Sequence, residues 1–284
     1  MQRHIFPKRS EISDKRAYGT VLGIGGSRGM AGAVAMAGRA ALLAGAGLVR
    51  LAVPDSVLET AAGFCPEYTL FPCSQDSAGR FALDSVPQLL EHCQGADAVF
   101  LGPGLGRSDE LRQLVQKVKD KVQQPLVIDA DGLQTSILNE IKEREMPLIL
   151  TPHGGEFARL RRAPTPCEVR ESDWKAAAGT FAEKYKVILV LKGHRTIVTD
   201  GFDFSFNETG NPGMATGGCG DVLTGLIAGL LAQKFAPPFE TVCLAVHLHG
   251  LAGDLAAKKL GEYSVTATAI LEHIPNAFLA SEQI

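Results

Sequence analysis

The chain lacks the long apolar runs and the basic blocks that mark membrane-spanning and nucleic-acid-binding proteins. No apolar stretch approaches the roughly 18 residues that a membrane-spanning helix requires, and the first residues show no signal-peptide pattern. No block of Lys and Arg is present, and the formal net charge is -3. Because nucleic acid and anionic membranes are bound through clustered positive charge, we expect neither as a general partner.

The cysteines are few and scattered, and they form no C-x-x-C pair and no metal-ligand spacing. The six positions are Cys65, Cys73, Cys93, Cys167, Cys219 and Cys243. The sequence therefore predicts no metal site built from protein ligands alone. It favours a reduced, cytoplasmic setting in which most of the thiols are small buried apolar groups.

The chain also lacks internal repeats and low-complexity linkers. Hydrophobic residues make up 45% of it and charged residues 21%, which is ample material for a buried core. We therefore expect residues 1–284 to form a single large domain.

Short β-prone apolar runs alternate with longer helical patterns after residue 20. Parallel strands are expected at 21–25, 48–54, 97–102, 125–128, 147–150 and 187–192, followed by a hairpin of 197–200 and 204–207. Helices are expected at 31–46, 109–122, 171–185, from about 221, at 239–260 and at about 266–280. This order predicts an α/β fold with a mostly parallel sheet and right-handed crossovers.

The loops that follow the expected strands are rich in glycine or in ionisable side chains. Because the carboxyl ends of parallel strands share one edge of an open sheet, these loops should converge on one cleft. The loop at 25–33 resembles a dinucleotide fingerprint, but no acidic residue ends the second strand before Pro54. This favours a loop that binds part of some substrate over a Rossmann site. The loop at 102–106 either admits a ligand close to its backbone or is a plain turn.

Two of these loops carry acids. Asp129 and Asp131 follow the fourth strand, where they could bind substrate hydroxyls or the outer shell of a metal ion. The alternative for Asp131 is that it caps a helix expected from about Leu133. His153 and Glu156 stand in the loop after the fifth strand, placed for function, although a lone histidine is often structural or solvated.

Two basic residues, and two histidines with a nearby aspartate, complete the candidate site residues. Lys192 and Arg195 flank a glycine turn, which suits nucleotide phosphates or, alternatively, a solvated hairpin. His247, His249 and Asp254 lie on one expected helix and are interpreted as structural, because no third metal ligand is spaced to join them.

A glycine-rich loop running into an apolar helix, residues 211–233, forms the most distinctive stretch. Its glycines free several backbone N–H groups to face one point, and the helix adds the positive end of its dipole. Such a loop can bind phosphate or the negative charge that develops in a transition state. Asp221 is then either a general base or an N-cap. Cys219 could be a nucleophile, or the loop could act through its backbone alone.

The loops together form an ordered series of motifs that spans nearly the whole chain. The series reads G-G-S-R-G-M-A-G-A at 25–33, G-P-G-L-G at 102–106, D-A-D-G-L at 129–133, T-P-H-G-G-E-F at 151–157, L-K-G-H-R-T at 191–196 and N-P-G-M-A-T-G-G-C-G-D-V-L-T-G at 211–225. With these motifs the chain resembles the ribokinase-like superfamily and, within it, the ADP- or ATP-dependent NAD(P)H-hydrate dehydratase family. The resemblance implies a three-layer α/β/α sandwich. Larger relatives fuse this unit to an epimerase domain, which we expect to be absent.

The resemblance also implies a metabolite-repair reaction. ADP, giving AMP and phosphate, or alternatively ATP would drive the dehydration of (6S)-NADHX and (6S)-NADPHX to NADH and NADPH. The C6 hydroxyl would be phosphorylated and the phosphate then eliminated. Mg²⁺ is expected on the nucleotide phosphates, and a homotetramer is the expected assembly.

The resemblance assigns roles by motif. Asp221 would deprotonate the C6 hydroxyl, and the N–H groups of Gly218, Cys219 and Gly220 would stabilise the transferring phosphoryl group. The contacts to the hydrated dinucleotide would come from Ala33, Gly106, His153 and Asp221. The adenine nucleotide would be held by Lys192, Gly193, His194, Arg195, Thr196 and Gly220.

Two other functions fit the same sequence. A ribokinase-like kinase acting on a vitamin precursor, of the hydroxyethylthiazole or hydroxymethylpyrimidine type, would share the glycine-rich loop and its aspartate. A non-catalytic dinucleotide sensor would share the binding loops but would not depend on Asp221 for turnover.

Overall fold

The computed structural model describes residues 6–138, 145–162 and 171–282. In these residues nine strands form one sheet in the order β3-β2-β1-β4-β5-β6-β7-β8-β9. The first seven strands, β1 to β7, pair in parallel, and β8 and β9 add an antiparallel hairpin at one edge. The strands are Thr20–Ile24 (β1), Leu48–Pro54 (β2), Thr69–Cys73 (β3), Ala98–Leu101 (β4), Leu126–Ile128 (β5), Leu148–Leu150 (β6), Ile188–Leu191 (β7), Ile197–Thr199 (β8) and Phe204–Phe206 (β9).

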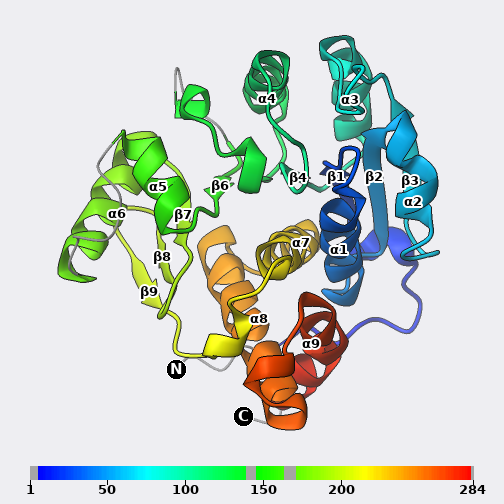
Figure 1. Ribbon diagram of the computed structural model, residues 1–284. Coiled ribbons are helices and arrows are strands. Elements are labelled where there is room, and N and C mark those ends of the chain that lie inside the picture. The colour runs from blue at the N-terminus through cyan, green and yellow to red at the C-terminus, as the bar shows by residue number, and fades with distance from the viewer. Residues whose placement is uncertain (1–5, 139–144, 163–170, 283–284) are drawn as a thin grey trace.

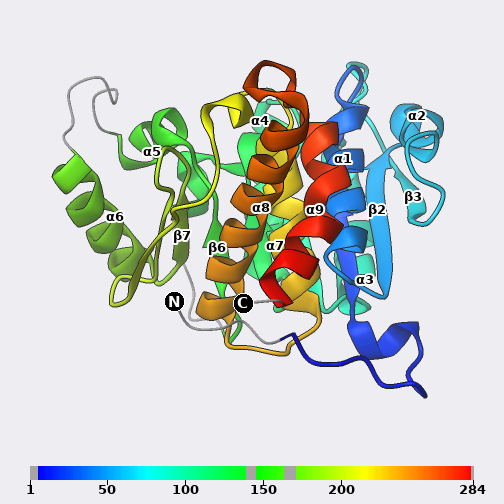
Figure 2. The same cartoon turned by 90° about the horizontal axis from the view of Figure 1, so that it is seen from below.

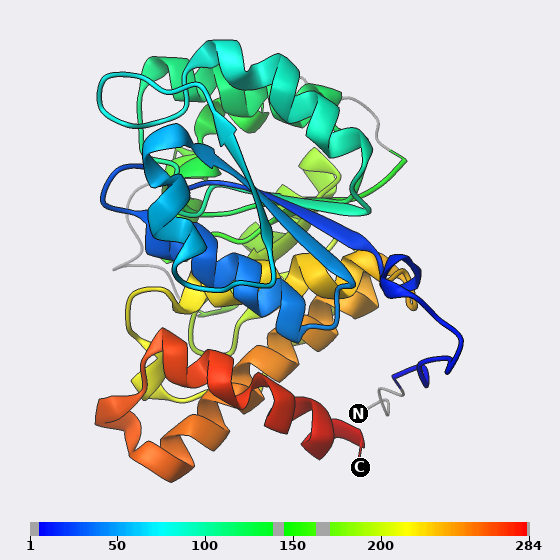
Figure 3. The same cartoon turned by 90° about the vertical axis from the view of Figure 1, so that its right-hand side faces the viewer.

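Helices cover both faces of the sheet, so the fold has three layers (Figures 1 and 3). One face packs against α3 (Val86–Gln94), α4 (Asp109–Lys121), α5 (Gly154–Arg161) and α6 (Glu171–Tyr185). The other packs against α1 (Ala31–Leu43), α2 (Leu58–Ala62), α7 (Cys219–Ala232), α8 (Pro238–Leu260) and α9 (Ala267–Glu282), and Figure 2 looks onto this second layer. In the described part of the chain, no helix combines the length and the apolar character that crossing a membrane requires.

This architecture confirms the predicted three-layer α/β/α fold with a mostly parallel sheet. Each of the six expected parallel strands lies within one residue of its predicted bounds, and the expected hairpin forms β8 and β9. The strong β-propensity of the buried runs, such as Ile188–Leu191, explains why these segments were readable from the sequence.

The prediction of a helix from about Leu133 is wrong for the residues that the structure describes there. Two short 3-10 turns, Ala130–Gly132 and Thr135–Leu138, occupy its start. Ala130 has a left-handed φ of 49°, and Leu133 has a ψ of 80°, so the backbone leaves the helical region on both sides of Asp131. The turn lets the chain fold back under the loop at Gly102, whose Cα faces Gly132.

The segment between β2 and β4 contains elements that the sequence pattern did not predict, namely α2, β3 and α3. Strand β3 is an edge strand, contains Pro72 and is mostly half-exposed, so it lacks the continuous apolar run of the central strands. Its hydrogen bonds to β2 exist only because the tertiary structure brings the two segments together.

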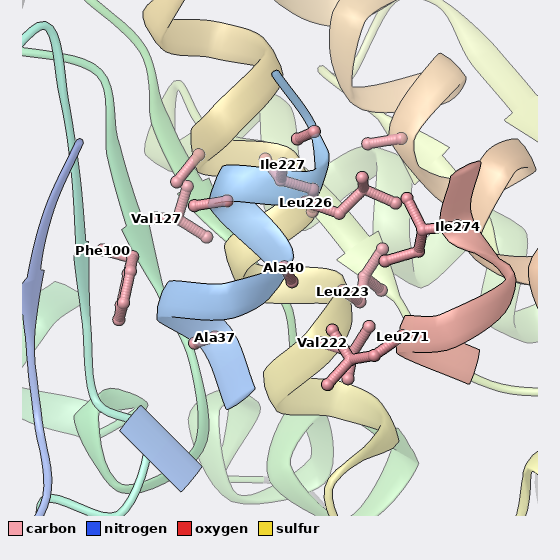
Figure 4. Packing of buried hydrophobic residues seen from close by; sticks show 14 of the residues in the cluster. Ala37, Ala40, Phe100, Val127, Val222, Leu223, Leu226, Ile227, Leu271 and Ile274 are labelled. Atoms are coloured by element: carbon pink, nitrogen blue, oxygen red, sulfur yellow. The ribbon is translucent and has the colours of Figure 1, made fainter. Parts of the chain in front are cut away.

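Helix α7 lies at the centre of its layer and is buried from Val222 to Ala232. Figure 4 shows its side chains, including Leu226 and Ile227, between the sheet residues Phe100 and Val127 and the α9 residue Ile274. This environment accounts for a helix that is apolar on every side.

Small residues let α7 approach α1 closely. A Cβ at Gly225 would overlap the carbonyl oxygen of Ala37, and one at Gly229 would lie 2.6 Å from the carbonyl oxygen of Ala41. The two helix backbones are therefore in direct contact along this line.

We expect the substitution Gly225→Ala to lower the free energy of unfolding by about 1–3 kcal/mol, because the added methyl group must push α7 away from α1. The matched control is Gly32→Ala on α1, where the nearest atom to the new Cβ would be 4.0 Å away. That change should leave stability unchanged or raise it by about 0.5–1 kcal/mol through helix propensity. Denaturant unfolding of both variants measures the difference, and equal effects would contradict the close contact.

Candidate active site

The amino end of α7 lies at the carboxyl edge of the sheet, where several strand-end loops meet. Asp129 directly follows β5, and Lys192 directly follows β7. The backbone N–H of Lys192 donates to the carbonyl oxygen of Pro152 after β6, so the ends of β6 and β7 stay paired there. A Cβ at Gly220, in the first turn of α7, would lie 3.1 Å from the Lys192 Nζ and 3.6 Å from the Asp129 Oδ2. These groups form one compact site.

The residue that caps the start of α7 is a glycine for a steric reason. Gly218 is the N-cap and has φ of 92°, and a Cβ there would lie 2.7 Å from the Met36 Cε and 2.9 Å from the Ala267 Cβ. The helix starts at Cys219, two residues before the expected start. Its first-turn N–H groups have no acceptors within the helix, so they are available to an anion.

Asp221 is the third residue of α7 and makes no capping hydrogen bond. The interpretation of Asp221 as the N-cap is therefore wrong, because the capping position belongs to Gly218. Among the described residues, no Lys or Arg nitrogen lies within 4 Å of its carboxylate. Its side chain is half-buried and is left available to a ligand.

A buried ion pair stands beside Asp221. The Lys192 Nζ is 2.7 Å from the Asp129 Oδ1 and 4.0 Å from the Glu156 Oε2, and the Asp129 side chain is only 1% exposed. The Thr224 hydroxyl donates to the second Asp129 oxygen at 2.8 Å. Burial opposes the charge on Lys192, but the carboxylates around it outweigh burial, and the pKa of Lys192 is raised.

The electrostatics of the site favour a proton acceptor at neutral pH. Burial and, next, the negative charge of Asp129 raise the pKa of Asp221 to about 7, although Lys192 acts in the opposite direction. Asp131 and Glu156 are also close enough to raise it. A carboxyl group with this pKa can accept a proton with appreciable driving force near neutral pH.

Cys219 and His249 stabilise the start of α7. Burial raises the pKa of the Cys219 thiol, so the thiolate that a nucleophile requires is disfavoured. Burial lowers the pKa of His249 to about 4, and its ring hydrogen-bonds to the Cys219 backbone. Asp254 accepts hydrogen bonds from the Gly210 N–H and the Asn211 side chain. These contacts agree with the structural roles expected for His249 and Asp254.

On one side of Asp221, the loops at 25–33 and 102–106 are joined. The Gly26 N–H donates to the Pro103 carbonyl oxygen at 2.8 Å, and a Cβ at Gly104 would lie 3.1 Å from the Ala33 Cβ. Ala33 and the neighbouring Gly106 loop thus belong to one wall of the site.

Asp131 holds the Gly106 loop in place. Its carboxylate accepts from the Gly106 N–H at 3.1 Å and pairs with the Arg107 Nε at 2.7 Å. The expectation that Asp131 caps a helix is therefore wrong: there is no α-helix at Leu133 for it to cap, and its oxygens are used across the loop.

His153 and Glu156 do not stand in an open loop as expected, because α5 begins between them. The His153 ring accepts from the N–H groups of Gly155 and Glu156, and the Glu156 carboxylate accepts from the His153 N–H at 2.9 Å. This is a reciprocal capping box. The His153 side chain is 57% exposed, so it can also contact a ligand.

The turn between β7 and β8 lines a small cavity. The turn contains Gly193, His194, Arg195 and Thr196, and the Thr196 hydroxyl closes it by donating to the Gly193 carbonyl oxygen at 3.1 Å. The cavity measures about 230 Å³ and is also lined by Gly154, Trp174 and Lys192. A larger cavity of about 740 Å³ lies at the opposite edge of the sheet, between the arm at Phe6–Arg9 and α9, away from Asp221.

Two residues of the site escaped the sequence analysis. Thr224 is a lone hydroxyl within the apolar run of α7, and that contrast was the available signal. Trp174 is the only tryptophan of the chain, but its position beside the β7–β8 turn depends on how α6 packs on the sheet. Sequence spacing could not show that Thr224 bonds to Asp129 or that Trp174 lies beside the β7–β8 turn.

The site fits a nucleotide-borne Mg²⁺ better than a metal ion held by the protein alone. In the described ranges, no group of three or more His, Cys, Asp or Glu residues is placed to hold a metal ion. Both Asp129 oxygens are already bonded, and Glu156 Oε2 accepts from a backbone N–H. Mg²⁺ commonly binds through substrate phosphates, one or two carboxylates and water.

Comparison with known proteins extends this picture. The family pattern described as NAD(P)H-hydrate dehydratase matches residues 21–276. A bifunctional NAD(P)H-hydrate repair enzyme from Moorella thermoacetica is 40% identical over 277 residues, which are 96% of this chain and 52% of that enzyme. The chain spans about half the length of the curated relatives it matches.

Solved structures agree with the sequence matches. A ribokinase-like superfamily protein from Enterococcus faecalis has a TM-score of 0.82 and 32% identity, with 98% of this chain and 92% of that chain covered. An ADP/ATP-dependent NAD(P)H-hydrate dehydratase from Bacillus subtilis, co-crystallised with ATP and Mg²⁺, has a TM-score of 0.81 and 28% identity, with 98% and 95% covered. The predicted ribokinase-like fold is confirmed.

We expect His153→Ala to lower the free energy of unfolding by about 1 kcal/mol, because the first-turn N–H groups of α5 lose their acceptor. His153→Asn is the matched control, since asparagine is a good N-cap, and it should retain the stability of the unsubstituted protein to within about 0.5 kcal/mol. Denaturant unfolding of the two variants makes the comparison. An equal loss in both would show that the cap contributes nothing.

Proposed function

The chain belongs to the NAD(P)H-hydrate dehydratase family, and from this we propose that it is a metabolite-repair lyase that converts (6S)-NADHX and (6S)-NADPHX to NADH and NADPH. ADP, giving AMP and phosphate, or alternatively ATP supplies the driving force. The relative from Bacillus subtilis, named ADP/ATP-dependent, supports the use of an adenine nucleotide.

The observation that carries the proposal is the Asp221 carboxylate. It stands in the first turn of α7 with no capping bond, and its pKa is raised to about 7. In the proposed reaction it accepts the proton of the C6 hydroxyl while the hydroxyl oxygen attacks the terminal phosphoryl group. The N–H groups of Gly218, Cys219 and Gly220 stabilise the charge on that group, and elimination of phosphate completes the dehydration.

The nucleotide side of the proposed site is the turn from Lys192 to Thr196 together with Gly220. Its support is the cavity of about 230 Å³ that Trp174 lines from α6. An indole beside a cavity of this kind suits contact with an adenine ring, and the charged Lys192 lies toward α7, where the phosphates must be. Mg²⁺ bound to the phosphates would neutralise charge during transfer.

The proposed contacts to the hydrated dinucleotide are Ala33, Gly106, His153 and Asp221. Their support is geometric: Asp131 connects to the Gly106 backbone and Glu156 to that of His153, and both acids influence Asp221. The two loops therefore face the general base from different strands of the sheet.

The finer assignments are part of the same proposal. We infer that residues 1–284 act as one dehydratase domain, in a reducing, cytoplasmic compartment, and assemble as a homotetramer. The support for the compartment is that the five cysteines of the described residues are free: Cys65, Cys73, Cys93, Cys219 and Cys243. Cys167 lies outside the described residues.

We expect the protein to form NADH from NADHX in the presence of ADP or ATP, and Asp221→Asn to lower the rate by about 10²–10⁴-fold, because the general base is lost. NADH absorbance measures the rate with each nucleotide in parallel. Asp109→Asn is the matched control, since it neutralises an acid in the first turn of α4, and it should have no effect.

The fluorescence of Trp174 provides a check on binding. Nucleotide titrations should show that Asp221→Asn still binds ADP or ATP, which separates a lost base from a lost site. If the unsubstituted protein formed no NADH with either nucleotide, the proposal would fail. A stable phosphorylated vitamin precursor would instead identify the related kinase, and full repair activity in Asp221→Asn would exclude a general base.

We expect kcat/KM of the repair reaction to fall about tenfold per pH unit below about pH 7 and to level off above it, because Asp221 must be unprotonated to act as a base. A raised pKa places this acid limb about three units above that of an ordinary aspartate. Initial rates at low substrate concentration across the neutral range measure it. A rate independent of pH down to pH 5 would contradict the assignment.

A further inference from the structure

The site contains one half-buried cation, Lys192, among several carboxylates, and the cation is not paired with the proposed base. The Lys192 Nζ lies 2.7 Å from Asp129 and 4.0 Å from Glu156, whereas no contact within 4 Å joins it to Asp221. Yet Asp221 is its near neighbour, because Lys192 stands against the Gly220 backbone one residue away. The fold therefore directs Lys192 to one acid in preference to the other.

Asp129 is built to hold that lysine. Its side chain is 1% exposed, and its two oxygens accept from Lys192 and from the Thr224 hydroxyl. Its N–H donates to the Leu101 carbonyl oxygen, and the Gly132 N–H donates to its own carbonyl oxygen. With its side chain and both backbone groups hydrogen-bonded, Asp129 is held in a fixed position between Lys192 and α7.

The charges that face Asp221 come from several elements. Asp129 follows β5, Asp131 lies in the turn after it, Glu156 lies in the first turn of α5 and Lys192 follows β7. From α7 itself comes the Cys219 thiol, and the His249 ring of α8, which burial keeps neutral near pH 7, hydrogen-bonds to the Cys219 backbone. Lys192 lowers the pKa of Asp221, and it is opposed by the three carboxylates of Asp129, Asp131 and Glu156.

We propose that Asp129 is a positioning residue that holds Lys192 on itself and so prevents it from pairing with Asp221, which keeps Asp221 a base of suitable strength for the proposed reaction. The inference rests on the proposed function only for the meaning of that base. The pairing and its effect on the protonation of Asp221 belong to the free protein.

The chemical consequence is a balance between two requirements. A carboxylate that pairs directly with a lysine typically has a pKa lowered by about 1–3 units, and it becomes a correspondingly weaker proton acceptor. Lys192 must nevertheless remain charged and close to α7 if it is to contact phosphates. The Asp129 pair satisfies both requirements, because it keeps the ammonium ion charged while leaving Asp221 without a direct ion-pair partner.

The test is a titration of Asp221 in the free protein by carboxyl-carbon NMR with labelled aspartate. The resonance is assigned by its loss in Asp221→Asn. In the unsubstituted protein we expect a midpoint near pH 7. In Asp129→Asn, where Lys192 is released toward Asp221, we expect a midpoint about 1 pH unit lower. An unchanged or higher midpoint would overturn the proposal.

The route through Lys192 is tested by a double-mutant cycle. In the Lys192→Met background there is no cation to release, so adding Asp129→Asn should lower the midpoint by less than about half as much as it does when Lys192 is present. An equal decrease in both backgrounds would show that Asp129 acts directly on Asp221 and would exclude the positioning role.

The variant Thr224→Val distinguishes the effect of the Asp129 charge from the effect of a local loss of stability. It removes one hydrogen bond to Asp129 without changing any charge, so it should lower the unfolding temperature and leave the Asp221 midpoint within about 0.3 pH unit. If Asp129→Asn does not fold, Asp129→Ser serves as the second neutral replacement. A shift in Thr224→Val as large as that in Asp129→Asn would contradict the proposal.

The same shift should appear in the acid limb of kcat/KM for Asp129→Asn, with kcat reduced by about three- to tenfold. Failure of the repair assay in the unsubstituted protein would disprove the proposed function and leave the NMR titration valid. Conversely, normal repair activity with an unshifted Asp129→Asn midpoint would disprove only this inference.

Discussion

The contact between α7 and α1 is the constraint on which the site depends. Gly225 lies directly against the backbone of α1, so the axis of α7 is fixed relative to the sheet. This fixed axis brings the bare amino end of the helix, with Gly218 as its cap, to the carboxyl edge where β5, β6 and β7 end. A bulkier contact would move the first turn, and with it Asp221, away from the strand ends.

The electrostatics of the site follow from this placement. An aspartate in the first turn of a helix would ordinarily be stabilised as the anion by the helix dipole. At this edge the same aspartate is partly removed from water and also meets the negative charge of Asp129, and these effects outweigh the dipole. Lys192 could have reversed the balance, but it is bonded to Asp129. Helix packing and one ion pair therefore set the chemistry together.

Much of the fold could be predicted from the sequence, because the central strands are buried on both faces and read as continuous apolar runs. The failures occurred where local pattern was overridden. Strand β3 contains Pro72 and lies at the sheet edge, and the chain after Asp129 turns back at Ala130 and does not start a helix. Of the site, the loops and Asp221 could be identified, whereas Thr224 and Trp174 could not.

The sequence alone determined most of the strands and helices and the motifs of the family, since these depend on local composition and spacing. It also identified Asp129, Lys192 and Asp221 as candidates. Only the tertiary structure decided that Lys192 pairs with Asp129 and not with Asp221, because the choice depends on distances of about 3–4 Å between elements far apart in the chain. It likewise decided that His153 caps a helix and that Asp131 holds the Gly106 loop. Charge interactions at this range are set by packing, and sequence spacing does not encode them.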